Sequence, residues 1–408
     1  MGGGGGGNPT TVTFTFKGAA PTAVAAQIGS GSFKAETVSS GAVSLSIPDG
    51  TTKFAVAYVC PSVAVMAGGT QVGQNTNETI VEASTADGTS FTVTCYTIPA
   101  STESGTLTGS VDASAISGAN HTAVVAANGS FGNETFGSGA TSNFSLSMPA
   151  GTDRVGLAGY VYTSGPFGAN SVWTLAALRN FDGVTVPGAV NGGSTVALGA
   201  ADAVTQESIT YKNVPQDYHA PTTLAEYIWS GGGGLQLSNG ATSQYPAVPA
   251  AAAKSGDSYL FAAAAHSGTG SGVVAISTIS AAGPVTFSFP APWTYSGPTP
   301  AALPTFDFNY SGFSSKTGVA NTGLMGWSPK TDSENLIEVI ASGNYLSGST
   351  SVGIPDLSSL AGFLAAPASG AQVFWGADVM QSDAGVLQAT SGAVDAVGVE
   401  TAGVYTVP

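Results

Sequence analysis

The sequence predicts an all-β protein built from tandem β-sandwich domains. Short runs alternate apolar and polar residues, as in Val12–Phe16, Val43–Ile47 and Phe144–Met148, and this period of two is typical of strands with one buried face. Turn residues separate such runs, as at Pro48–Gly50, where Pro presets φ and Gly accepts a positive φ. A segment of about 100 residues also occurs twice, and this length matches one small sandwich.

An ungapped match carries this internal repeat. Ser44–Thr51 aligns with Ser145–Thr152, and downstream Thr89–Thr94 echoes Ser194–Leu198. The period is far longer than that of a solenoid repeat, so it indicates two sister domains. The expected order is a flexible Gly-rich tether at 1–9, sandwich repeats at 10–100 and 103–203, and a C-terminal β-domain at 205–408.

The C-terminal region differs in composition and holds four of the five Trp residues. We expect one larger β-sandwich region there, which could consist of two halves joined by the Pro-rich segment 290–304. Short helices are expected at Thr223–Trp229 and Asp356–Leu364, where Asp356 could serve as an N-cap. The strand candidates are Gly234–Leu237, Ser258–Ala264, Val273–Ile279, Val285–Phe289, Leu324–Trp327, Leu336–Ala341, Gln372–Trp375 and Val404–Val407.

The hairpin within each repeat resembles a known family. The string Phe144–Gly151, a strand followed by Pro-x-Gly, is similar to the carboxypeptidase-regulatory-like (transthyretin- or prealbumin-like) β-sandwiches. The aromatic residue usual two positions after the Gly is replaced by Asp153 here and by Thr52 in the first repeat. The resemblance implies a binding or spacer sandwich without catalytic residues of its own. The string Gly353–Phe363 resembles segments of uncharacterised bacterial lipoproteins, which implies no activity.

The start of the chain bears on its location. Gly2–Gly7 cannot bury side chains and forms a flexible tether. It resembles the spacer of a mature bacterial lipoprotein that lacks its signal peptide and lipidated Cys; the alternative is a cloning linker. No run of 18 apolar residues occurs, so a membrane contact is expected only through a lipid anchor absent from this sequence. We expect an extracytoplasmic protein of the bacterial cell envelope or cell surface.

The two cysteines, Cys60 and Cys95, lie at the ends of strand-like runs and match no zinc or redox motif. A disulfide between them would close a loop in the unfolded chain and stabilise the fold by roughly 3–4 kcal/mol in the chain-entropy model. An extracytoplasmic compartment permits this bond. The alternative is a pair of buried free thiols.

The charge balance limits the partners. Nine Lys and Arg face 24 Asp and Glu, giving a net charge of −15 with only 8% charged residues. So few bases cannot neutralise a run of phosphates, which argues against nucleic-acid binding. A charge-poor surface rich in Ser and Thr favours a secreted or surface protein.

Motifs for catalysis are not found in the sequence. The three histidines, at His121, His219 and His266, stand alone without ligand spacing. No Gly-x-Ser-x-Gly string occurs. We therefore expect a non-enzymatic protein with no catalytic residue and no cofactor, although a hydrolase with a site built from dispersed residues stays open.

One acidic cluster and one aromatic cluster are the remaining candidates. Asp332, Glu334 and Glu338 could form a weak calcium site, because hard cations prefer several oxygens; the alternative is solvated charge, and we expect no dedicated metal site. Trp293, Tyr295 and Tyr310 could form an exposed platform for sugar rings. The alternative is that these rings pack inside the domain.

The sequence therefore supports three functional hypotheses. The first is a lipid-anchored surface protein with a structural or adhesive role, in which the sandwiches act as a spacer that presents the C-terminal domain. The second is a carbohydrate-binding surface protein that uses the aromatic platform. The third is the hydrolase just described. The expected partner is a polysaccharide or a surface protein.

Overall fold

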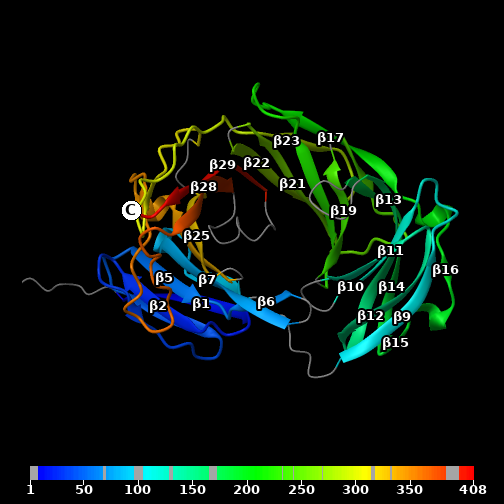
Figure 1. Ribbon diagram of the computed structural model, residues 1–408, viewed down its shortest axis with the longest axis horizontal. Coiled ribbons are helices and arrows are strands. Elements are labelled where there is room, and N and C mark those ends of the chain that lie inside the picture. Colours follow the sequence, from blue (N-terminus) through cyan, green and yellow to red (C-terminus); the bar gives the residue numbers. More distant parts are fainter. Residues whose placement is uncertain are drawn as a thin grey trace, which may run out of the picture. The chain divides into compact units, whose positions relative to one another are not determined.

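The computed structural model describes residues 8–67, 70–95, 104–127, 132–164, 172–231, 233–241, 243–268, 270–313, 318–330, 333–382 and 395–408. The chain is almost entirely β (Figure 1), which confirms the predicted fold class. The one α-helix among the described residues is α1 (Gly343–Leu346). No helix in these ranges is long and apolar enough to span a membrane.

The chain divides into two compact units. Unit 1 contains 1–98, 266–274 and 290–408, and unit 2 contains 99–265 and 275–289. One strand plan recurs in both units. We call its four occurrences copy one (10–95), copy two (104–197), copy three (205–288) and copy four (305–406).

Copy one shows the plan in full. In its first sheet, β1 (Thr10–Gly18) pairs antiparallel with β4 (Ala42–Ile47) and parallel with β8 (Ser90–Cys95). Its second sheet has the order β3–β2–β5–β7. The strands of that sheet are β2 (Ala23–Ile28), β3 (Lys34–Ala35), β5 (Lys53–Val59) and β7 (Thr70–Ser84), and β6 (Val63–Ala67) adds a hairpin to β7.

Copy two follows the same plan. In its first sheet, β9 (Ser104–Asp112) pairs antiparallel with β12 (Thr141–Pro149) and parallel with β15 (Gly188–Ala189) and β16 (Val196–Ala197). The second sheet has the order β11–β10–β13–β14. Its strands are β10 (His121–Ala127), β11 (Gly132–Ser138), β13 (Gly151–Ser164) and β14 (Val172–Val186).

Copy three repeats the plan, although the sequence shows no ungapped match to it. Here β17 (Thr205–Lys212) pairs antiparallel with β20 (Gln244–Ala247) and parallel with β23 (Val285–Ser288). The second sheet has the order β19–β18–β21, and β21 leads through a tight turn into β22. These strands are β18 (Thr222–Ile228), β19 (Gly234–Ala241), β21 (Ser258–His266) and β22 (Ser271–Ile279).

Copy four has the same order with one difference in its first sheet. There β24 (Thr305–Asp307) pairs antiparallel with β27 (Ser351–Gly353). Among the described residues, this sheet consists of these two strands. The second sheet has the order β26–β25–β28–β29. Its strands are β25 (Val319–Lys330), β26 (Ser333–Ser342), β28 (Gln372–Ser382) and β29 (Ala396–Thr406).

Alternating side chains build a separate core inside each copy. In copy one, Phe14, Phe54 and Phe91 are buried, and the rings of Phe14 and Phe91 stack 4.8 Å apart. In copy three, the rings of Tyr245 and Phe261 lie edge to face at 4.7 Å. Every second residue is buried in the central part of β1 and along β21, as the alternation in the sequence predicts.

Strand pairing also joins the copies within each unit. In unit 1, β7 of copy one pairs in parallel with β26 of copy four, from Asn335 opposite Thr76 to Ala341 opposite Glu82. In unit 2, β14 of copy two contacts β19 of copy three at Thr174 and Ser238. Sequence neighbours are therefore not the only packing partners, because copy one and copy four are far apart in the chain.

Two of the sequence-based expectations are wrong. Residues 223–228 belong to strand β18 rather than to a helix, and Thr223, Ala225 and Tyr227 are buried at every second position. Trp229 directly follows the strand and is also buried. Residues 356–364 form successive turns, and Asp356 accepts hydrogen bonds from Ser358 instead of capping a helix. The predicted division into domains stays a prediction, although 205–408 contains two copies of the plan.

Candidate functional sites

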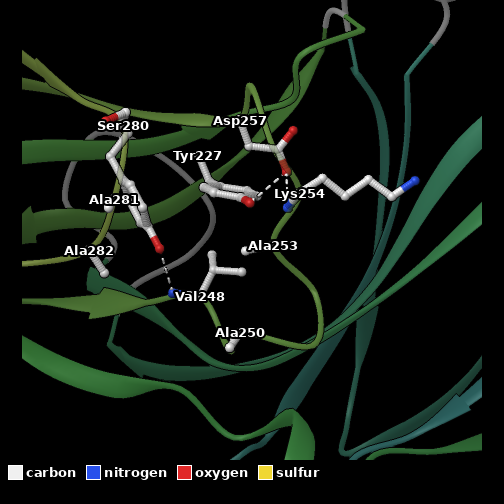
Figure 2. A pocket seen from close by; sticks show the side chains of 10 residues that line it. Tyr227, Val248, Ala250, Ala253, Lys254, Asp257, Ser280, Ala281 and Ala282 are labelled. Carbon is white, nitrogen blue, oxygen red and sulfur yellow. Dashed lines mark hydrogen bonds between the residues drawn. The ribbon is translucent and has the colours of Figure 1, made fainter.

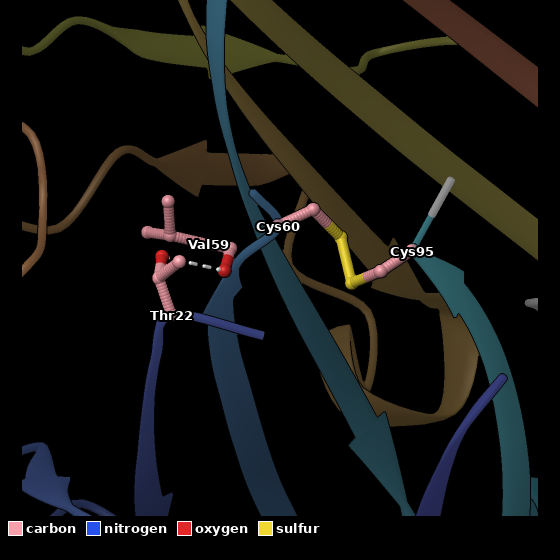
Figure 3. The surroundings of a disulfide bond; sticks show 4 residues. All are labelled: Thr22, Val59, Cys60 and Cys95. Carbon is pink, nitrogen blue, oxygen red and sulfur yellow. Dashed lines mark hydrogen bonds between the residues drawn. A yellow bond between two sulfur atoms is a disulfide. The ribbon is translucent and has the colours of Figure 1, made fainter. Parts of the chain in front are cut away.

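The predicted disulfide is present in copy one. Cys60 directly follows β5, and Cys95 ends β8, so the bond joins the two sheets of the sandwich (Figure 3). The two Cα atoms lie 5.3 Å apart. Beside the bond, the Thr22 hydroxyl donates to the Val59 carbonyl oxygen at 3.1 Å and fixes the neighbouring end of β5. The cysteines therefore act as a structural clamp.

The predicted aromatic platform is a packed cluster. Trp293 is only 4% exposed, and its ring stacks on Tyr295 at 4.8 Å and on Phe308 at 5.9 Å. Its indole N–H donates to Asn309 Oδ1 at 3.2 Å. The expectation of an exposed ring at Trp293 is therefore corrected, because both neighbouring rings cover its faces. Tyr295 and Tyr310 are half-buried, and their role as ligand contacts stays a prediction.

Only two of the three candidate calcium residues lie among the described residues. Glu338 lies on β26 and is half-buried, and Glu334 lies near the start of the same strand. Asp332 lies outside the described residues. Within the described ranges, no three His, Cys, Asp or Glu side chains gather as a potential metal site. The calcium hypothesis stays a prediction.

Copy four instead brings together acidic side chains that the sequence does not connect. Asp378 on β28 lies directly opposite Glu400 on β29. Burial and then the charges of Glu338 and Glu400 raise the pKa of Asp378 to about 8. On the neighbouring strand β25, Thr322 lies opposite Asp378. Asp378 therefore stays protonated to a higher pH than an exposed carboxyl group, because a second negative charge on opposed strands is costly.

The histidines are dispersed in the structure. His121 lies on β10 and contacts the ring of Tyr162. His219 lies in an irregular, exposed segment. His266 ends β21, and its Nδ1 atom lies 3.6 Å from Glu400 Oε1, where both side chains are about half exposed. These three residues come from three separate places in the fold.

Unit 2 contains a cavity of about 250 Å³ that sequence reasoning missed. Its wall consists mainly of Ala, Val and Tyr side chains, and Asp257 lies at one end, bonded to Tyr227 (Figure 2). The side chain of Lys254 points away from the other lining residues (Figure 2). The lining residues are Tyr227, Val248, Ala250, Ala253, Lys254, Asp257, Tyr259, Ser280, Ala281 and Ala282.

Asp257 is the most heavily bonded carboxylate of this region. Arg154 contacts both of its oxygens at 2.9 and 3.0 Å, and the Tyr227 hydroxyl donates to it at 2.6 Å. The backbone N–H groups of Ser230 and Lys254 add bonds of 2.9 Å each. Burial acts to raise the pKa of Asp257, but these hydrogen bonds outweigh burial and lower the pKa to about 2.

Arg154 is held just as firmly. Its Nη2 atom donates to the Ala252 carbonyl oxygen at 2.9 Å, and its guanidinium lies 4.9 Å from the ring centre of Trp229. Arg154 comes from copy two, whereas Asp257 and Trp229 come from copy three. The ion pair therefore fixes one copy to the next. Both Asp257 oxygens accept internal hydrogen bonds, whereas Arg154 Nε has no hydrogen-bond partner and lies 3.7 Å from Asp182 Oδ1.

The sequence contained a weak signal for this pair. Arg154 aligns with Lys53 in the first repeat, so a base lies near the start of the equivalent strand in both copies, β5 and β13. Lys53 instead lies over the Tyr345 ring in unit 1, 5.3 Å from its centre. No pattern in the sequence identifies Asp257 as the partner, because the two residues are 103 positions apart.

Comparison with known proteins assigns no family. No family model matches the chain, and no curated protein matches it. Among solved structures, a candidate adhesin from Bacteroides ovatus has 8% identity and a TM-score of 0.16, covering 41% of this chain and 73% of its own. The Bacillus anthracis TIE protein has 8% identity and a TM-score of 0.14, covering 91% of this chain. The match spans 63% of the length of the TIE protein. At these TM-scores neither likeness transfers a fold or a function.

Proposed function

We propose that this chain is a non-enzymatic, extracytoplasmic surface protein whose β-sandwiches form a structural or adhesive body. The observation that carries the proposal is the fourfold use of one strand plan within a single chain. Repeated sandwiches provide length and large side surfaces, and each copy has its own core. Such an arrangement suits a protein that spans distance or presents contact surfaces.

Chemical features of the chain support the compartment. The disulfide between Cys60 and Cys95 is a bond that persists in oxidising environments and is rare in the cytosol. The surface carries few charges, since only 8% of residues are charged. The non-enzymatic part is supported by the Asp257 carboxylate beside the cavity, whose two oxygens are committed to internal hydrogen bonds.

The finer proposal concerns the anchor and the family. Gly2–Gly7 resembles the spacer of a bacterial lipoprotein, and on this resemblance we propose a lipid anchor and a location in the bacterial cell envelope. The resemblance of the Phe144–Gly151 hairpin to prealbumin-like sandwiches supports a spacer role. We propose a surface protein as the partner rather than a polysaccharide, because the ring best placed to stack on sugars, Trp293, is buried.

Protease treatment of intact cells that naturally make the chain tests the location. We expect the chain to be cleaved on intact cells while a cytosolic marker stays protected until lysis. Metabolic labelling with a radioactive fatty acid tests the anchor on the same cells. Protection of the chain on intact cells, together with its recovery in the cytosolic fraction, would overturn the proposal. A cleaved but unlabelled chain would retain the surface role and remove the lipid anchor.

A further inference from the structure

The cavity of unit 2 lies in copy three, between two short loops. The first loop contains four consecutive alanines at 250–253, and the second contains residues 280–282. The larger lining residues Tyr227, Val248 and Tyr259 are buried, so they form the deeper part of the cavity. An alanine side chain is a single methyl group, so it leaves the space between the loops open. The alanines that line the cavity are exposed: Ala250, Ala253, Ala281 and Ala282 (Figure 2).

Hydrogen bonds to the body of unit 2 hold both loops in place. The Tyr245 hydroxyl donates to the Gly283 carbonyl oxygen at 2.9 Å and accepts from Gly283 N–H at 3.0 Å, which fixes the end of the second loop. In the first loop, the Ala252 carbonyl oxygen accepts from Arg154 at 2.9 Å and from Asn180 Nδ2 at 2.7 Å. The cavity is therefore formed before a ligand arrives, as is usual for small-molecule sites.

The two charged residues of the lining do not select an ion. The Asp257 oxygens accept five hydrogen bonds, and its charge is paired with Arg154. Lys254 forms an ion pair with Asp182 and points away from the cavity (Figure 2). The other lining residues are Ala, Val, Tyr and one Ser, among which a charged ligand would lose its hydration without gaining a partner. The chemistry of the lining therefore favours an uncharged ligand.

The Tyr259 hydroxyl adds one polar requirement. Tyr259 is only 3% exposed, and its hydroxyl accepts from Val248 N–H at 3.1 Å. A hydroxyl also has one hydrogen to donate, and within the described ranges that hydrogen has no acceptor. Because a buried donor without an acceptor is costly, this side chain points to a ligand that supplies an oxygen acceptor.

The size and the aromatic wall of the cavity fit a single ring. A protein cavity of about 150 Å³ can hold benzene, and this cavity has a volume of about 250 Å³. The rings of Tyr227 and Tyr259 lie 5.0 Å apart and are tilted by 60°, so they offer faces and edges against which another aromatic ring packs. We propose that the cavity binds one uncharged aromatic ring whose oxygen substituent accepts a hydrogen bond from Tyr259.

This inference goes beyond the proposed function and does not depend on it. A structural protein without adhesive contacts could hold such a ring, and an adhesive protein could leave the cavity unused. The same ring chemistry occurs in free small phenols and in the tyrosine side chain of a partner protein. The experiment therefore includes a probe of each kind.

The test uses the full chain with ¹³C-labelled alanine methyl groups and p-cresol as the probe. We expect saturable NMR shifts at the four lining alanines, with one dissociation constant of about 1 mM or lower. Toluene has the ring without the oxygen, and it should bind about threefold more weakly or worse because the bond from Tyr259 is lost. Glucose should not bind measurably, because its hydroxyl groups would be buried against apolar side chains.

N-acetyltyrosinamide distinguishes the two sources of the ring, since it carries the same phenol on a peptide backbone. Binding at least as tight as that of p-cresol would identify the ring as a partner's tyrosine side chain. Weaker binding at the same alanines would identify it as a free small molecule. Either result supports the site, because both require the cavity to take the ring.

A matched pair of variants locates the ring. Ala253→Leu enlarges a side chain that lines the cavity, whereas Ala251→Leu makes the same change on the same loop at a residue outside the lining. We expect Ala253→Leu to weaken p-cresol binding about tenfold or more and Ala251→Leu to change it about twofold or less. Both residues are exposed, and circular dichroism with the melting temperature verifies that both variants are folded.

Three outcomes would overturn the proposal. The first is the absence of saturable shifts at the lining alanines of folded wild type, since water alone would then fill the cavity. The second is binding of toluene or glucose as tight as that of p-cresol, which would contradict the assigned ring chemistry. The third is an equal loss of binding in the two leucine variants, which would place the ring elsewhere. None of these results bears on the location of the chain in the cell.

Discussion

At the residue scale, the most constrained group is the buried pair of Arg154 and Asp257. The Asp257 side chain is 2% exposed and that of Arg154 is 12% exposed. Removing two charges from water is costly, and this cost is recovered only where the remaining hydrogen-bonding capacity is satisfied. Asp257 meets that condition through its bonds to Tyr227, Ser230 and Lys254, so loss of either charge leaves the other uncompensated.

Replacement of Asp257 should therefore destabilise unit 2 strongly. We expect Asp257→Ala to lower the free energy of unfolding by about 3–5 kcal/mol, because it leaves the Arg154 guanidinium buried without its partner. Asp182→Ala is the comparison variant, since Asp182 is about half exposed, contacts Lys254 and lies 3.7 Å from Arg154 Nε, and such exposed contacts contribute about 0–1 kcal/mol each. Urea unfolding measures both changes, and equal effects would refute the assigned role of Asp257.

Trp293 gives a second prediction at this scale. Because its ring is buried between Tyr295 and Phe308, we expect Trp293→Ala to cost about 3–5 kcal/mol of stability. Tyr295→Phe is the control, because it removes only the hydroxyl that accepts from Asp307 N–H. A glycan array run with wild type and both variants should show no sugar binding that depends on Trp293. Specific binding lost in folded Trp293→Ala would restore the carbohydrate hypothesis.

At the element scale, the strands of each copy depend on partners that are distant in sequence. Residues 222–228 contain Thr, Leu, Ala, Glu, Tyr and Ile, a mixture that local propensity leaves undecided. Pairing with β19 and β21 makes this segment a strand and buries Thr223, Ala225 and Tyr227 on one side. Strands with clear alternation, such as Val12–Phe16, could be predicted without knowing their partners.

The disulfide supplies the prediction at this scale. Cys60 and Cys95 are 35 positions apart, and opening a loop of that length is expected to cost roughly 3–4 kcal/mol. We expect the double variant Cys60→Ser with Cys95→Ser to lose that much stability. Wild type in the presence of a reductant should be as unstable as this double variant. Denaturant unfolding of wild type with and without reductant checks this. A double variant as stable as the oxidised chain would show that the clamp is dispensable.

At the scale of the whole molecule, the largest carboxyl pKa shifts in the two units have opposite signs. In unit 1, burial raises the pKa of Glu78 and Glu82 to about 7, and burial with neighbouring charge raises that of Asp378 to about 8. A raised carboxyl pKa stabilises the fold fully below the unfolded value of about 4, and this contribution is lost as pH rises through the folded pKa. In unit 2, the lowered pKa of Asp257 stabilises above about 4 and is lost as pH falls toward 2.

We therefore expect unit 1 to be less stable at pH 9 than at pH 5, with most of the loss between pH 5 and 8. Asp378→Asn should flatten this dependence, because Asn keeps the shape and never becomes charged beside Glu400. Hydrogen exchange during heating at both pH values measures the stability of the strands of each unit separately. Greater stability of β28 and β29 at pH 9 would contradict the assignment.

The sequence by itself determined the all-β class and the sister relation of copies one and two, and it predicted the disulfide that the structure then showed. These features arise from local alternation, turn residues and two cysteines, which are visible without knowing long-range contacts. Only the tertiary structure decided that 205–408 repeats the same plan twice, that Trp293 is buried, and that Arg154 meets Asp257. The physical reason is that strand pairing and side-chain burial depend on partners distant along the chain. A sandwich plan can persist through backbone pairing when the sequence match has been lost.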